Sequence, residues 1–79
     1  MKNIITNTIL SHFREVKPKL EFDSNDSSFK EELGLDSLDM AEFVARIEQE
    51  YRIEIPEEDW SQIATVNLMT EYIYNVNHS

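Results

Sequence analysis

Apolar residues recur at helical spacing near the N-terminus of the chain. The residues Ile5, Ile9, Phe13 and Val16 lie four, four and three residues apart. Two further apolar residues, Ile4 and Leu10, lie beside them. This spacing places one apolar stripe along one face of an α-helix. Pro18 ends that helix, because a proline ring cannot continue the helical hydrogen-bond pattern.

A second apolar stripe follows the only glycine of the chain, Gly34, which permits a tight approach of the backbone. Asp36 is a good N-cap and Asp39 adds negative charge to the first turn, so this helix is expected to begin at Ser37. Charged residues fall on the other faces of this helix. Its apolar positions keep helical spacing and are Met40, Phe43, Val44, Ile47 and Tyr51. The pattern predicts an amphipathic helix of about four turns.

The last part of the chain predicts a short helix and a longer one. The run RIEIP alternates like a strand but has no partner strand, so we interpret it as an extended connection that ends at Pro56. Pro56 and the three acids after it are typical of a first helical turn. Thr65 then caps a final helix, and residues 77–79 are expected to fray. The inner stripe of that helix comprises Val66, Met69, Tyr72, Ile73 and Val76.

A long polar connection, residues 19–36, joins the first two predicted helices. A short turn is expected around SFKEEL. Five apolar residues can anchor the connection to the core: Leu20, Phe22, Phe29, Leu33 and Leu35. Its DSNDSS run is similar to the opening of a calcium loop. However, Ser28 stands where that loop needs glycine and Gly34 where it needs a bidentate glutamate. We therefore interpret the connection as a packed loop and predict no metal site.

Length and composition favour one small all-α domain, residues 1–79. The chain is too short for two cores and has no cysteine for a disulfide, so locally packed helices are the economical solution. We expect a small four-helix bundle, three longer helices and one short one, that acts as a monomer. Polar residues interrupt the N-terminal apolar run, so no signal peptide or membrane span is predicted there, and a cytoplasmic protein is expected.

The net charge of −9 is concentrated in the middle of the chain. Residues 36–60 hold nine acids and two arginines, a net charge of −7. Such a patch repels nucleic acid and attracts basic protein surfaces. The alternative is a solvated helix face that only keeps a small protein in solution, and charge alone favours it.

Little in the chain supports catalysis. A serine nucleophile needs a base and a group that orients it. The only histidines are His12 and His78, and the chain has no glycine-rich elbow, so a triad is not expected. No histidine and cysteine spacing suggests zinc. Ser37 instead presents a hydroxyl at a helix N-terminus, where free N–H groups and the helix dipole suit a phosphate attached to that oxygen.

Residues 28–76 resemble the acyl carrier protein family. Gly34, Asp36, Ser37 and Leu38 fit the family's attachment motif, and the similarity continues through SFKEELGLDSLD, the acidic helix, IEIPEEDW and IATVNLMTEYI. The first helix agrees only in its apolar pattern. The resemblance implies that a phosphopantetheinyl transferase adds 4'-phosphopantetheine from coenzyme A to Ser37. The arm's thiol would then hold an acyl group as a thioester, and the chain itself would perform no chemistry.

The resemblance also implies an acidic partner surface. The partners would be acyl-chain synthases, transferases and ligases with Lys and Arg around their active-site entrances. These basic residues would meet Asp36, Asp39, Glu42 and Glu48, with Glu57 and Glu58 as second candidates. Leu38 and Ala41 would form the apolar centre of that contact. Leu38 could equally be an ordinary, partly buried residue.

In the same family the bundle interior accepts the acyl chain. The matching positions are Phe29, Phe43, Ile47, Tyr51, Ile55, Trp60, Ile63, Met69, Tyr72 and Ile73. Trp60, Met69 and Leu68 stand where the fatty-acid type has small residues, and Met40 and Ala41 also differ from its commonest pattern. An inward Trp60 would narrow the space, and an outward one would join the partner surface.

These departures leave room for a dedicated carrier in a specialised lipid or polyketide-type pathway beside a fatty-acid role. Two other functions stay open at this point. One is a carrier of aminoacyl or aryl groups. The other is an acidic helical adaptor that is never modified.

Overall fold

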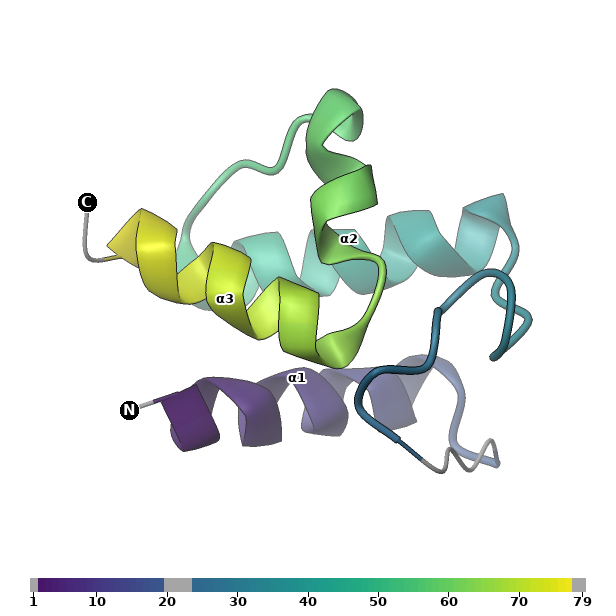
Figure 1. The fold of residues 1–79 in the computed structure, drawn as a ribbon. Helices are drawn as coiled ribbons and strands as arrows, with labels where there is room; N and C mark the ends of the chain where they lie inside the picture. The colour runs from purple at the N-terminus through teal and green to yellow at the C-terminus, as the bar shows by residue number, and fades with distance from the viewer. Residues whose placement is uncertain (1, 20–23, 78–79) are drawn as a thin grey trace.

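The computed structural model describes residues 2–19 and 24–77 of the chain. Their elements are α1 (Lys2–Val16), α2 (Ser37–Tyr51), the 3-10 helix η1 (Glu57–Ile63) and α3 (Val66–Asn77). Helix α3 packs against both α1 and η1, and α1 packs against α2. Figure 1 shows η1 standing across the direction of α3, while α1 begins and α3 ends on the same side. The predicted all-α architecture of three longer helices and one short one is confirmed.

Three phenylalanine rings from different segments meet at the centre of the core. Phe13 of α1, Phe29 of the long connection and Phe43 of α2 are all fully buried. Their ring centroids lie 5.1–5.7 Å apart, with two of the three contacts edge-to-face. Such contacts add to the burial of apolar area, so this cluster joins α1, α2 and the connection into one core.

The residues of the predicted apolar stripes are buried or partly buried, and two apolar residues depart from this pattern. Val76 is 39% exposed and Ile4 is 69% exposed. Val76 lies in the last turn of α3, at the edge of the face that Met69 and Ile73 bury, so its place in the inner stripe was wrong. Thr70, which the apolar pattern did not indicate, is a buried polar residue whose hydroxyl shares a 2.9 Å hydrogen bond with that of Thr6.

The described part of the long connection is a packed loop, as predicted. The N–H of Phe29 donates to the carbonyl of Ala64 at 2.9 Å, and the N–H of Leu35 donates to the carbonyl of Phe29 at 2.9 Å. In the DSNDSS run, Asp26 accepts a 2.6 Å hydrogen bond from the side chain of Asn67, which ties the loop to α3. Leu20 and Phe22, predicted as anchors, lie outside the described residues.

The helix boundaries follow the predictions closely. Helix α1 ends at Val16, before Pro18, and the hydroxyl of Thr65 caps α3 by accepting from the N–H of Leu68 at 3.0 Å. The short helix begins at Glu57, one residue after the predicted start, with Pro56 in the cap position. Asn77 is the last residue of α3, so the helix extends one residue into the predicted tail. His78 and Ser79 lie outside the described residues.

Candidate functional site

Ser37 is the first residue of α2, and a capping box fixes the backbone on both sides of it. The Asp36 carboxylate accepts from the N–H of Asp39 at 2.8 Å, and the Asp39 carboxylate accepts from the N–H of Asp36 at 3.4 Å. This reciprocal arrangement satisfies two backbone donors at the helix start. Ser37 itself is exposed. The local sequence therefore holds an accessible hydroxyl at a defined helix terminus.

The backbone enters this site through Gly34, which has φ of +75°. Residues with a Cβ rarely adopt this conformation, so glycine suits the turn for that reason. A Cβ built on Gly34 would meet no heavy atom within 4 Å. The expectation that Gly34 permits a tight approach was therefore wrong: the position needs a positive φ and opens onto free space.

The start of α2 suits an attached anion. Among the described residues, the N–H groups of Ser37 and Leu38 donate to no hydrogen-bond acceptor, since the cap bonds engage Asp39 and Met40 instead. Unpaired N–H groups and the helix dipole together favour negative charge at such an end. A phosphate ester on the Ser37 oxygen would lie at that end of the helix.

Lys17, which sequence reasoning missed, forms an ion pair beside Ser37. Its Nζ lies 2.9 Å from Oδ2 of Asp39, which links the end of α1 to the start of α2. The hydrogen bond from Lys17 holds the pKa of the Asp39 carboxyl below its usual value, assisted by the N–H of Asp36 and opposed by desolvation. The same contact raises the pKa of Lys17. No local pattern could reveal this pair, because it joins separate elements.

The outer face of α2 beside Ser37 is open. Leu38 is 81% exposed, which excludes the alternative of a partly buried residue. Ala41 and Glu42 are exposed on the same helix. Glu42 lies 4.0 Å from Nε of Arg46, a distance too long for a strong hydrogen bond. An apolar residue with an acidic neighbour thus lies within the first turns after the serine.

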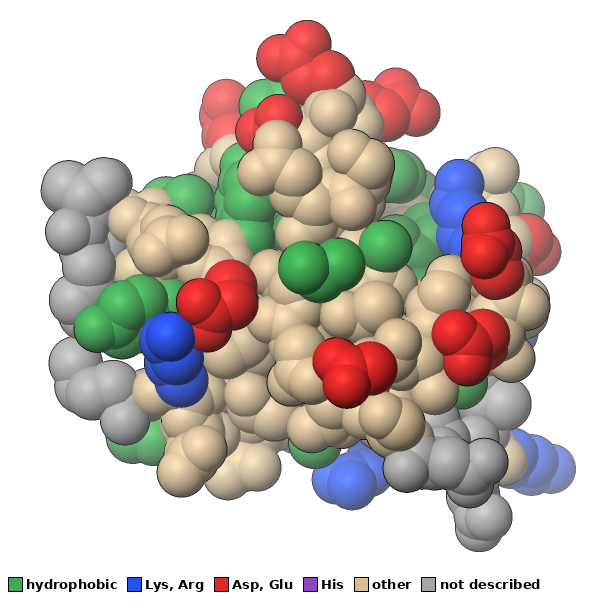
Figure 2. All heavy atoms as spheres, viewed as in Figure 1, with side chains coloured by type: hydrophobic (Ala, Val, Ile, Leu, Met, Phe, Trp, Pro, Cys, Tyr) green, Lys and Arg blue, Asp and Glu red, His purple; other side chains and the backbone are tan. Residues whose placement is uncertain are grey.

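The other predicted acids lie in two kinds of environment. Glu48 is partly buried, and its carboxylate accepts from the N–H of Ile55 at 2.8 Å, so it holds the connection after α2 in place. Glu57 and Glu58 are exposed in the first turn of η1. Figure 2 shows acidic side chains gathered at the top of the molecule, over the end where η1 begins. Glu48 has a structural contact that the sequence did not indicate.

Most of the predicted acyl-pocket positions fill the core. Seven of them are at most 4% exposed: Phe29, Phe43, Ile47, Ile55, Ile63, Met69 and Ile73. Tyr51 packs partly buried against the core, and the Tyr72 hydroxyl donates to Asp59 at 2.9 Å. Burial, followed by the contact with Asp59, raises the pKa of Tyr72.

A hollow of about 290 Å³ opens near the start of α2. Its lining includes Phe29 and Trp60 from the predicted set, and also Met40, which follows Ser37 by one helical turn. The indole N–H of Trp60 donates to the carbonyl of Ile55 at 3.2 Å, and the ring is half-buried. Trp60 therefore forms part of the wall of this hollow, between the inward and outward placements that the sequence left open.

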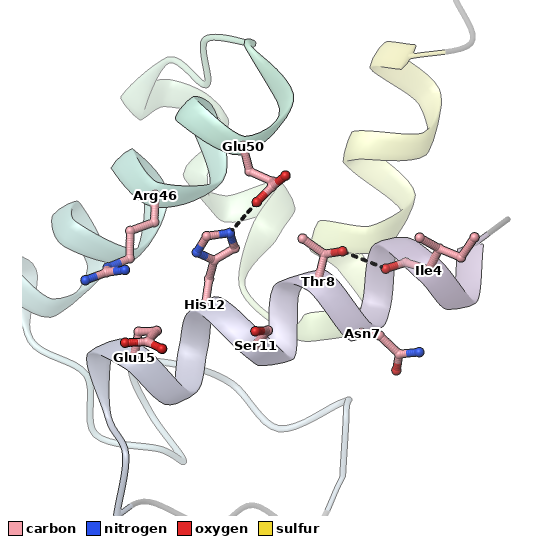
Figure 3. Close-up of a pocket in the computed structure, with 8 residues that line it drawn as sticks. All are labelled: Ile4, Asn7, Thr8, Ser11, His12, Glu15, Arg46 and Glu50. Atoms are coloured by element: carbon pink, nitrogen blue, oxygen red, sulfur yellow. Dashed lines mark hydrogen bonds and ion pairs between the residues drawn. The ribbon is translucent and has the colours of Figure 1, made fainter.

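His12 lies far from Ser37. Its Nε2 is 2.9 Å from Oε1 of Glu50, in a hollow of about 580 Å³ between α1 and α2. Figure 3 shows this contact bridging the two helices, with Arg46 one turn nearer the start of α2 than Glu50. Glu50 and Ser37 belong to opposite ends of α2, about 20 Å apart at 1.5 Å per residue. His12 therefore cannot serve as a base for the Ser37 hydroxyl.

A small helical fold with an exposed serine at the capped start of an acidic helix defines the class of carrier domains. The chain matches the family model described as a phosphopantetheine attachment site over residues 7–73. It therefore belongs to this family of phosphopantetheine-binding carriers, as the resemblance implied. Such a domain is not catalytic: a phosphopantetheinyl transferase modifies a serine with 4'-phosphopantetheine, and synthase enzymes then act on the loaded carrier. This membership decides against an unmodified adaptor.

Within residues 2–19 and 24–77, no helix has both the length and the apolar content needed to cross a bilayer. This agrees with the polar residues that interrupt the apolar run of α1.

Proposed function

We propose that this chain is an acyl carrier whose Ser37 bears the 4'-phosphopantetheine arm. The observation that carries the proposal is the exposed Ser37 at the capped first residue of α2, inside the matched region. The carrier would serve fatty-acid synthesis or a dedicated lipid or polyketide-type pathway. It would act as a single domain and a monomer in the cytoplasm, since a net charge of −9 opposes self-association and the chain has no cysteine.

The residues around Ser37 suit the phosphodiester that such a modification creates. The exposed hydroxyl can reach a transferase, and the N–H groups of Ser37 and Leu38 are available to an anion at this position. Open space beside Gly34 leaves room for the arm. When bound, the group supplies a thiol that holds an acyl group as a thioester. The chain's own part is to present the oxygen and to be recognised.

Recognition would use the outer face of α2 and the start of η1. Leu38 and Ala41 would provide apolar contact. Basic side chains of partners would meet the acids around them, which are Asp36, Asp39 and Glu42, with Glu57 and Glu58 on η1. Exposed ion pairs are individually weak and are screened by salt. Weak, electrostatically steered binding suits a carrier that must leave one enzyme before visiting the next. Glu48 has a smaller role, because Ile55 already occupies its carboxylate.

The hollow beside Met40 and Trp60 is the proposed resting place of the cargo near the arm. The buried predicted pocket positions would have to move apart to admit a long alkyl chain, because the phenylalanine cluster fills the centre. A small acyl group would need no such movement if it rested in the hollow of about 290 Å³. This supports a dedicated pathway more than a general fatty-acid role.

A carrier of aryl or aminoacyl groups is the second candidate. The observation that favours it is the Trp60 ring in the wall of the hollow, because an aromatic cargo could stack on it. The acidity of the chain and its Ile-Pro segment favour the acyl carrier. Loading of the modified chain by acyl-activating and by amino-acid-activating ligases separates the two. Preferential loading by the second kind of ligase would reverse the assignment.

Intact-mass measurement tests the attachment site. Incubation with coenzyme A and a broad-specificity phosphopantetheinyl transferase should add the mass of one phosphopantetheinyl group to the chain. Ser37→Ala should stay unmodified, while Ser61→Ala, which removes another exposed serine, should be modified like the unaltered chain. An unchanged mass of the unaltered chain, or modification that survives Ser37→Ala, would contradict the proposal.

A further inference from the structure

We propose that Lys17 is a specificity-determining residue of the carrier, because it holds the Asp39 carboxylate and so withholds it from partners. The end of α1 would then help to decide which basic surfaces can bind at the start of α2. This inference rests on the proposed function, since it concerns recognition around Ser37.

The contacts show that Asp39 is already engaged within the chain. Its Oδ2 lies 2.9 Å from Nζ of Lys17 and accepts from the N–H of Asp36. The Asp36 carboxylate is likewise engaged, by the N–H of Asp39. Glu42 differs, since within residues 2–19 and 24–77 its carboxylate forms a single ion pair, the 4.0 Å one with Arg46. The acid closest to Ser37 on α2 is thus less available than the acid one turn further on.

Lys17 is held in position by its backbone while its side chain stays accessible. Its N–H donates to the carbonyl of Phe13 at 2.8 Å, and Phe13 is fully buried in the core. The side chains of Lys17 and Asp39 remain 37% and 25% exposed. A partner can therefore reach this pair, but it must compete with Lys17 for the carboxylate.

The chemistry of that competition identifies the kind of partner that succeeds. Lysine offers a point charge, whereas arginine can donate two parallel N–H groups to one carboxylate. A partner's arginine that reaches the start of α2 can replace the contact of Lys17 with Asp39. A partner's lysine only exchanges one ammonium group for another. We therefore infer that partners which use Asp39 present an arginine to it.

Transferase kinetics on the full chain test the inference. Lys17→Met should raise kcat/KM for modification of Ser37 by about twofold to fivefold at low ionic strength, the range that an exposed ion pair supports. Salt should shrink the gain. Lys19→Met is the matched control, because it removes the same charge from an exposed lysine with no recorded contact to Asp39. It should produce less than half of the gain.

Two further variants separate a local contact from a general change of charge. In an Asp39→Asn background, Lys17→Met should give no additional gain, since the carboxylate it withholds is gone. Lys17→Arg, which keeps the ion pair and the fold, should leave the rate unchanged or lower it. Thermal melting of every variant shows that each rate belongs to a folded chain.

Several results would overturn the inference. They are equal gains for Lys17→Met and Lys19→Met, a loss of rate on Lys17→Met, or the same gain with and without Asp39. These outcomes differ from failure of the proposed function, in which the unaltered chain is not modified on Ser37 at all. Modification of the unaltered chain together with an unresponsive Lys17→Met would reject this inference alone.

Discussion

The two ends of α2 are stabilised in different ways. At its start, Asp36 and Asp39 cap the helix reciprocally and Ser37 is exposed. At its end the backbone supplies the cap: Arg52 adopts a left-handed conformation with φ of 55°, and its N–H donates to the carbonyl of Glu48. Contacts from other segments hold this end, such as that of His12 with Glu50. Local side-chain capping defines the start of α2, to which the Lys17–Asp39 pair adds one contact from α1, whereas the end of α2 combines a backbone cap with the contact from His12.

This difference bears directly on function. A site that many enzymes must recognise needs its geometry before any partner arrives. A capping box supplies that geometry from neighbouring residues and leaves the outer face, with Leu38 at 81% exposure, free for contact. The opposite end has no such requirement and can depend on packing.

The substitution with the largest expected effect on stability should destabilise both ends of α2. Phe43→Ala should lower the free energy of unfolding by about 3–5 kcal/mol, because it removes a fully buried ring from the phenylalanine cluster. Chemical denaturation measures the loss. Leu68→Ala is the control, since Leu68 is 45% exposed and its truncation should cost far less.

The same variant shows whether the two ends share one core. Hydrogen exchange of the Met40 and Ile53 amides reports the start and the end of α2, because both are hydrogen-bonded there. Phe43→Ala should speed exchange at both. Faster exchange at one amide only would contradict a common core.

The next effect is specific to the start of the helix. Asp36→Ala should cost about 1 kcal/mol of unfolding free energy, because the N–H of Asp39 loses its cap acceptor. Asp36→Asn keeps an acceptor and should retain most of the stability. Urea denaturation of both variants gives the comparison. Equal losses for the two would mean that charge matters at this position more than the cap hydrogen bond.

A gain in stability is expected at the other end. Arg52→Gly should raise the unfolding free energy by about 0.5–1 kcal/mol, because glycine adopts a positive φ without the cost of a Cβ. Arg52→Ala, which removes the charge but keeps the Cβ, should show no such gain. Thermal melting distinguishes the two. A comparable gain from the alanine variant would assign the effect to charge.

The smallest expected effect concerns pH at the start of α2. The hydrogen bond from Lys17 keeps the pKa of the Asp39 carboxyl below its ordinary value, so the contribution of this carboxylate to stability is present above that ordinary value. It is lost as the pH falls through the lower pKa of the folded state. The stability difference between the unaltered chain and Asp39→Asn should therefore shrink on acidification below about pH 4. A difference that is constant from pH 6 to the acid limit of folding would rule out this linkage.

Sequence patterns predicted the helix start and its cap around Ser37 better than the contacts that surround them. Ser37, Asp36 and Asp39 lie within one helical turn, so their relation depends on the local backbone and can be predicted from spacing. Lys17 reaches the same turn only after α1 has packed against α2. The role of Glu48 was missed for the same reason, since its acceptor contact with Ile55 forms where the chain folds back after α2.

The sequence by itself determined the four helices, the cap before Ser37 and membership in the carrier family, because periodicity, capping and motif are properties of nearby residues. Only the tertiary structure decided that Lys17 engages Asp39, that Trp60 forms part of a hollow wall beside Met40, and that Gly34 serves a positive φ. The physical reason is that the first two features join separate segments. The third depends on a dihedral angle that residue type permits but does not impose.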